Sequence, residues 1–123
     1  MSAHTFRGNI HDMDFNEYQQ TANKTATYSK NDQEYKLMYL SLGLAGETGE
    51  VIEKIKKIIR NDGAVVSEEK KHLLMHELGD VLWYLSQMAK ELDVSFDEVA
   101  AANLQKLADR AARGAIKSEG DTR

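Results

Sequence analysis

Apolar residues recur every three or four positions along most of this chain, which is the spacing of one face of an α-helix. Proline does not occur, and there are no valine-rich runs in which apolar and polar residues alternate. The pattern therefore predicts an all-α protein.

Two helices are predicted in the first half of the chain. Asp14 is suited to cap a helix over about 15–28, because its side chain can accept a hydrogen bond from the first turn. The polar stretch 29–32 separates this helix from a longer one over about 33–60. The turn-forming sequence Asn-Asp-Gly at 61–63 then ends the second helix.

Two more helices are predicted in the second half. Ser67 is placed to cap a third helix that continues to about residue 92, and acidic residues follow it in the first turn. Ser95 and Glu98 form the capping box of a fourth helix that runs to about residue 113. Because such short connections make neighbouring helices antiparallel, we expect a four-helix, bundle-like protomer.

The length of 123 residues suits one domain over 1–123, and we expect flexible ends at 1–13 and 114–123. The chain has no cysteine, so it has neither disulfides nor a thiolate zinc site. It also lacks a signal-peptide pattern and a long apolar run, which predicts a cytoplasmic protein without a membrane partner. The net charge of −4 argues against nucleic-acid binding. Any phosphate group of a ligand must therefore be bound by a metal ion or by a few suitably positioned cationic side chains.

Four acidic residues occupy matching positions on the second and third helices. Glu47 and Glu50 border the apolar stripe of the second helix, and Glu77 and Asp80 border that of the third at the same offsets. If the stripes pack antiparallel, both pairs can meet along one border of the interface. The two stripes consist of Leu37, Leu40, Leu44, Val51, Ile55 and Ile58, and of Leu74, Leu78, Val81, Leu85, Met88 and Leu92.

Acidic residues three apart on a helix have Cβ atoms about 5 to 6 Å apart, close enough to share one cation. Four converging carboxylates would repel by about 4 kcal/mol per close pair at an effective dielectric near 20, and a divalent ion would relieve this repulsion. Oxygen ligands suit Mg²⁺ or Mn²⁺, which can activate water for phosphoryl transfer. A single E-x-x-E on a helix is usually a solvated face, and we interpret Glu53, Glu68, Glu69 and Glu91 as surface acids, with Glu53 the first exception to consider.

Three segments, GLAGETGEVIEKIKK, HELGDVLWYL and NLQKLADR, together resemble the MazG-like nucleotide pyrophosphohydrolases of the all-α NTP pyrophosphatase superfamily. The family pattern of E-x-x-E, a spacer and E-x-x-D is met by the four acids, with 26 residues between Glu50 and Glu77. The resemblance implies Mg²⁺-dependent hydrolysis of a nucleoside triphosphate to its monophosphate and pyrophosphate. The four acids would be the metal ligands and the catalytic residues.

The resemblance also implies substrate-binding residues. Tyr84 stands one turn after Asp80, where a tyrosine can line the nucleotide pocket, although it can equally be a core-edge aromatic. On the fourth helix, Asn103, Lys106 and Arg110 share one face, and the resemblance assigns the lysine and the arginine to the phosphates. Lys54 and Lys57, on the carboxylate side of the second helix, are weaker candidates for that task.

Two other functions compete with this interpretation. His72 and His76, one helical turn apart, could indicate a zinc hydrolase, but the other ligands of such a site are missing from the sequence. Alternatively, the chain could be a non-catalytic helical oligomerisation or partner-binding module, whose acids only keep its surface soluble. The sequence does not name the base or the sugar of a nucleotide substrate.

The second and third helices have apolar residues beyond their main stripes. On the second these are Met38, Leu42, Ile52 and Ile59, and on the third Leu82 and Ala89. Helices this apolar around their circumference need partners on more than one side. We therefore expect a homodimer or homotetramer, in which Lys106 or Arg110 of one chain could approach the metals of another.

Overall fold

The computed structural model describes residues 10–28 and 35–114, which contain four α-helices and no strand. The helices are α1 (Phe15–Asn23), α2 (Lys36–Asn61), α3 (Glu68–Glu91) and α4 (Phe96–Gly114). The prediction of an all-α chain with four helices is confirmed. Residues 33–34 of the predicted second helix and most of the predicted flexible ends lie outside the described residues. None of the described helices is long and apolar enough to cross a membrane.

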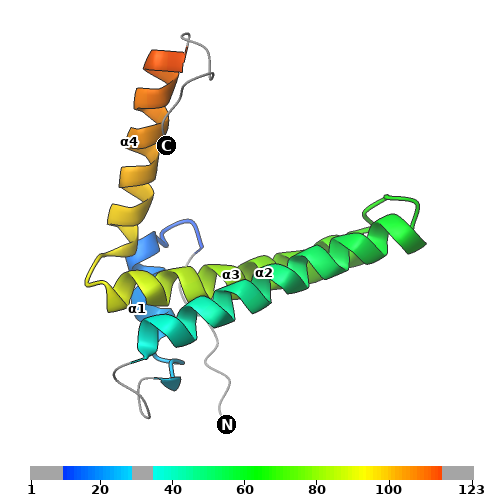
Figure 1. Cartoon of the computed structure of the whole chain (residues 1–123), viewed down its shortest axis with the longest axis horizontal. Helices are drawn as coiled ribbons and strands as arrows, with labels where there is room; N and C mark the ends of the chain where they lie inside the picture. The colour runs from blue at the N-terminus through cyan, green and yellow to red at the C-terminus, as the bar shows by residue number, and fades with distance from the viewer. Residues whose placement is uncertain (1–9, 29–34, 115–123) are drawn as a thin grey trace.

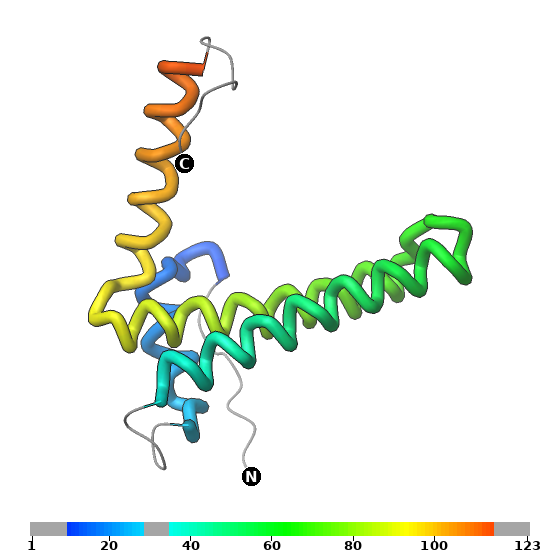
Figure 2. The backbone as a smooth tube through the Cα atoms, in the orientation of Figure 1, coloured from blue at the N-terminus to red at the C-terminus, as the bar shows by residue number. Residues whose placement is uncertain are grey.

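The helices form two arms that meet at a corner (Figure 1). One arm is the antiparallel pair of α2 and α3, which pack along their length, while α1 packs against α3 at the corner. The other arm is α4, which projects away from the pair, as the backbone trace in Figure 2 also shows. Within the described residues α4 contacts α1 and α3 but not α2. The protomer is therefore more open than the bundle that the short connections suggested.

Three of the helices begin at the caps that the sequence predicts. Asp14 accepts a hydrogen bond from the backbone N–H of Glu17 at 2.7 Å, and Ser67 accepts one from Lys70 at 3.2 Å. At the start of α4, Ser95 and Glu98 each accept a hydrogen bond from the other's backbone N–H, at 3.2 and 3.1 Å. These local patterns fix where the helices begin, because each cap satisfies N–H groups that have no partner inside the helix.

The first helix is shorter than predicted. It ends at Asn23, whereas the sequence predicted a helix to about Tyr28. The Thr25 hydroxyl donates to the carbonyl of Ala22 at 2.7 Å, and the indole N–H of Trp83 contacts both Ala22 O and Thr25 Oγ1, at 3.3 and 2.9 Å. Both side chains thus donate to a backbone carbonyl in the last turn of α1. Tyr28 then turns towards α3, where its hydroxyl donates to Glu91 at 3.0 Å.

The angle of α4 is set by two polar side chains of α1. Gln19, which is buried, donates to the backbone carbonyls of Ser86 and Val94 and accepts a hydrogen bond from the N–H of Phe96 at 3.1 Å. Asn16 accepts another from the N–H of Asp97 at 2.8 Å. Because these bonds satisfy N–H groups at the start of α4, α1 fastens the corner from which that helix leaves.

The apolar stripes of α2 and α3 are only partly covered within one chain. Leu40 and Ile58 are buried as predicted, but five other members are 41–59% exposed: Leu37, Ile55, Leu78, Leu85 and Leu92. The additional apolar residues of α2 are even more open, at 59–68% exposed: Met38, Leu42, Ile52 and Ile59. The protomer therefore presents a large apolar surface to its surroundings.

Candidate metal centre

The antiparallel packing of α2 and α3 brings three of the four predicted acids together. Glu47 on α2 and Glu77 and Asp80 on α3 each offer one carboxylate oxygen, and these oxygens lie within 4.8 Å of one another. Glu47 and Glu77 are half-buried, whereas Asp80 is exposed. The three side chains form what we call the carboxylate cluster. Its spacing suits a shared divalent cation, which accepts hard oxygen ligands from several side chains.

The electrostatics of the cluster are those of crowded negative charges. Burial raises the pKa of Glu47, and the negative charges of Asp80, Glu77 and Glu50 raise it further. Each of these effects disfavours the charged form of the carboxyl group. A cation between the oxygens would remove the repulsion, so the donor set fits Mg²⁺ or Mn²⁺.

The fourth acid, Glu50, is not part of this three-residue cluster. Its side chain is exposed, although its charge acts on both Glu47 and Lys54. Lys54, one turn further along α2, forms an ion pair with Glu77, with Nζ 2.9 Å from Oε1. The structure therefore joins one predicted cation, Lys54, directly to the carboxylate cluster.

Aromatic rings stand beside the carboxylates. Tyr84 packs its ring against Gly43, and a Cβ atom at that position would overlap the ring. Burial raises the pKa of Tyr84, with smaller contributions from Tyr39, Glu47 and Asp80. On α1, burial and the charge of Asp80 raise the pKa of Tyr18. Tyr84 therefore lies at the edge of the cluster, close to the place where the sequence put it.

Sequence reasoning did not select Tyr18 or Tyr39. Tyr18 approaches Asp80 only because α1 packs against α3, which no periodicity within α1 reveals. Tyr39 lies one turn before Gly43 on α2, and its ring stacks on that of Tyr28 with centroids 5.9 Å apart. The helical wheel could have indicated that Tyr39 lies near the cluster, since Tyr39 and Glu47 are eight positions apart on one helix and lie on neighbouring parts of its surface.

The predicted phosphate-binding residues of α4 are not brought to the cluster within one chain. Asn103 and Lys106 are exposed and Arg110 is half-buried. The helix that carries them diverges from the α2–α3 pair and has no contact with α2 among the described residues (Figure 1). These three residues can reach a carboxylate cluster only if the protomer closes or if another chain supplies the cluster.

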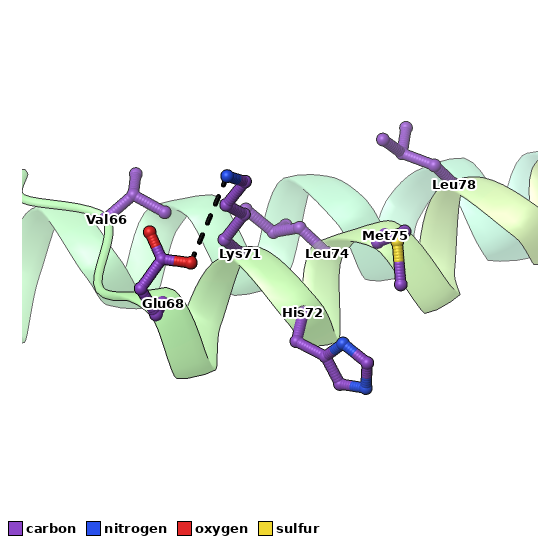
Figure 3. Close-up of a pocket in the computed structure, with 7 residues that line it drawn as sticks. All are labelled: Val66, Glu68, Lys71, His72, Leu74, Met75 and Leu78. Carbon is purple, nitrogen blue, oxygen red and sulfur yellow. Dashed lines mark ion pairs between the residues drawn. The ribbon is translucent and has the colours of Figure 1, made fainter.

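A separate apolar groove of about 500 Å³ lies beside the first half of α3 (Figure 3). None of the four predicted acids lines it, and its apolar wall includes Leu74, Met75 and Leu78. His72 also lines the groove, and its Nε2 atom is 3.1 Å from Nε2 of His76 one turn later. Neither histidine joins the carboxylate cluster, so the groove and the cluster are different features of α3.

Comparison with known proteins identifies the family. A model of the MazG nucleotide pyrophosphohydrolase domain matches residues 36–114, which hold α2, α3 and α4. The chain is also similar to the Gene 37 protein of Mycobacterium phage L5, with 43% identity over 109 aligned positions; the alignment covers 86% of this chain and 96% of that protein. No solved structure gives a significant match. The chain belongs to the MazG nucleotide pyrophosphohydrolase family.

Proposed function

We propose that this protein is a Mg²⁺-dependent pyrophosphohydrolase that converts a nucleoside triphosphate, of either ribose or deoxyribose type, into its monophosphate and pyrophosphate. The observation that carries the proposal is the grouping of Glu47, Glu77 and Asp80 oxygens within 4.8 Å in a member of this family. The carboxylates come from two helices and offer only oxygen ligands, as Mg²⁺ prefers. Mn²⁺ is the expected substitute.

The protein's own contribution is to hold ligands and substrate in place. Glu47, Glu77 and Asp80, with Glu50 at the margin, would hold the metal ions, which supply charge stabilisation for the phosphates and a more acidic water. The rigid α2–α3 pair fixes the carboxylates before substrate arrives, so little reorganisation is needed at the moment of reaction. Tyr84 would line the nucleotide pocket beside them, and Lys54 would meet the phosphates.

We also propose that the working species is a homodimer or homotetramer whose active site is shared between chains. Two observations support this: the exposed apolar residues of α2 and α3, and the separation of α4 from the carboxylates of its own chain. A second copy would cover the apolar surface, because a monomer rarely leaves so much of it in water. The same copy would bring Asn103, Lys106 and Arg110 to the phosphates.

A panel of nucleoside triphosphates, assayed with and without Mg²⁺, tests the proposed function. We expect at least one triphosphate to be hydrolysed only with Mg²⁺ or Mn²⁺, and the metal with a slowly hydrolysed analogue to raise the melting temperature, since ligands that bind only the folded state stabilise it. The exposed apolar faces also favour a second function, a non-catalytic oligomerisation module. That alternative predicts neither turnover nor a melting shift.

A further inference from the structure

The ion pair between Lys54 and Glu77 crosses the interface between α2 and α3. Its 2.9 Å length is that of a charge-assisted hydrogen bond, and both side chains are partly shielded, at 32% and 18% exposed. The hydrogen bond with Glu77 raises the pKa of Lys54, and the charges of Glu77 and Glu50 contribute to the same shift. The ammonium group therefore pairs directly with Glu77, a member of the carboxylate cluster.

The other lysine pairs of the described helices do not involve the carboxylate cluster. The pair of Lys36 and Glu91, at 4.0 Å, also joins α2 to α3, but Glu91 is not a member of the cluster. Lys56 pairs with Glu53 at 2.8 Å, but both residues belong to α2, and their side chains are 57% and 44% exposed. Glu53 is not part of the carboxylate cluster. Pairs of this kind on one exposed helix face contribute little to the fold. Lys54 alone among the ion-paired lysines of the described residues binds a member of the cluster.

A metal ion and the Lys54 ammonium group would compete for Glu77. A divalent cation held by Glu77, Glu47 and Asp80 would lie close to Nζ of Lys54, and two positive charges at that separation repel. The lysine side chain is long, flexible and one-third exposed, so it can leave Glu77 without disturbing the backbone of α2. The ammonium group, no longer paired with Glu77, would then be available at the edge of the cluster to form an ion pair with an anionic ligand that binds there.

We propose that Lys54 is an exchangeable counter-ion, which neutralises Glu77 in the metal-free protein, yields this carboxylate to the incoming divalent cation and then pairs with the substrate's phosphates. The inference rests on the proposed function, which supplies both the metal and the polyphosphate. Lys54 is a positioning residue for Glu77 before the metal binds. No covalent bond is made or broken in this exchange.

Metal binding without nucleotide tests the first half of the proposal. In the full chain, Lys54→Met should bind Mn²⁺ at least about threefold more tightly than the unchanged protein, measured by calorimetry or by the electron paramagnetic resonance of free Mn²⁺. Lys54→Arg should show no such gain, because an arginine keeps the charge and can hold Glu77 with two hydrogen bonds. Lys56→Met is the matched control, since it removes the same charge from the same helix.

Nucleotide kinetics test the second half. Lys54→Met should raise KM for the best triphosphate at least about tenfold at saturating Mg²⁺, while kcat changes less, because the lost contact is made on binding. Unchanged or weaker Mn²⁺ binding by Lys54→Met, or an equal gain in Lys56→Met, would overturn the counter-ion role. An unchanged KM would overturn the transfer to phosphate. Failure of the unchanged protein to bind Mn²⁺ or hydrolyse any triphosphate would instead reject the proposed function itself.

Discussion

The ring of Tyr84 on α3 occupies the space beside Gly43 on α2 where the Cβ atom of any other residue would stand. This contact lies one turn before Glu47 on α2 and one turn after Asp80 on α3, so it sets the separation of the two helices next to the carboxylate cluster. The absence of a side chain at position 43 is therefore a requirement of packing. Other glycines of α2 have no such neighbour.

Replacing Gly43 by alanine should destabilise the protein by about 1–3 kcal/mol, because the ring of Tyr84 must move out of a packed interface. Gly49→Ala is the matched control, since a Cβ atom at Gly49 meets nothing within 4 Å and alanine favours a helix by up to about 1 kcal/mol. Urea unfolding at one fixed protein concentration measures both. Equal effects of the two substitutions would contradict the packing role of Gly43.

The sequence could predict the features that depend on local periodicity and capping. The caps at Asp14, Ser67 and Ser95 are found as expected, because each depends on residues within one turn. The matching offsets of Glu47 and Glu77 beside their apolar stripes likewise needed only the geometry of a helix.

Features that depend on distant contacts could not be predicted in this way. The early end of α1 follows from hydrogen bonds between Trp83 and residues about 60 positions away, and the approach of Tyr18 to Asp80 follows from the packing of α1 against α3. Periodicity also indicated that Lys54 lies on the carboxylate side of its helix, but not that it pairs with Glu77. The direction of α4 depends on Gln19 and Asn16, whose roles appear only once the corner is assembled.

Substituting Glu47, Glu50, Glu77 or Asp80 by alanine should each lower turnover by at least about two orders of magnitude, because the acids act together on the metal ions. Circular dichroism should show that the fold survives. Glu53→Ala is the control, since Glu53 pairs with Lys56 on the surface of the same helix. An Asp80→Ala variant with full, Mg²⁺-dependent activity would show that the cluster does not carry the reaction.

Sedimentation at micromolar concentration should show at least a dimer. Leu42→Glu or Ile52→Glu should shift the protein towards monomers. Both native side chains are exposed in the single chain, at 68% and 62%, and a partner that covers this surface would have to bury the new charge. The helix itself should persist, since neither residue contributes to the buried core. A fully active monomer would exclude both the oligomer and the shared site.

The shared site makes a further prediction about mixed oligomers. A Glu77→Ala chain and a Lys106→Ala chain should each be inactive alone, but mixing and re-associating them should restore part of the activity. Recovery is expected because a mixed dimer contains one site with an intact carboxylate cluster and an intact α4 from opposite chains. Failure to recover any activity, in oligomers that demonstrably exchange chains, would place each complete site within one protomer.

The histidine pair offers a test of the zinc alternative. The 3.1 Å separation of the His72 and His76 Nε2 atoms is close to the spacing of two neighbouring ligands on one tetrahedral zinc ion, about 3.3 Å for bonds of about 2.0–2.1 Å. We expect His76→Ala to lose affinity for Zn²⁺ while it keeps its Mg²⁺-dependent turnover, because neither histidine is in the carboxylate cluster. A zinc hydrolase would be favoured by a different result, in which the unchanged protein turns over its substrate with Zn²⁺ but not with Mg²⁺ and His76→Ala loses this activity.

The products of a triphosphate, followed by phosphorus NMR from the first minutes of the reaction, test the central claim most directly. With Mg²⁺ present, we expect the signals of a nucleoside monophosphate and of pyrophosphate to appear together in equal amounts, and no reaction with the Asp80→Ala protein. Hydrolysis of the anhydride bond between the α and β phosphates gives this pair of products and no other. Nucleoside diphosphate and orthophosphate as the first products would contradict the pyrophosphohydrolase assignment.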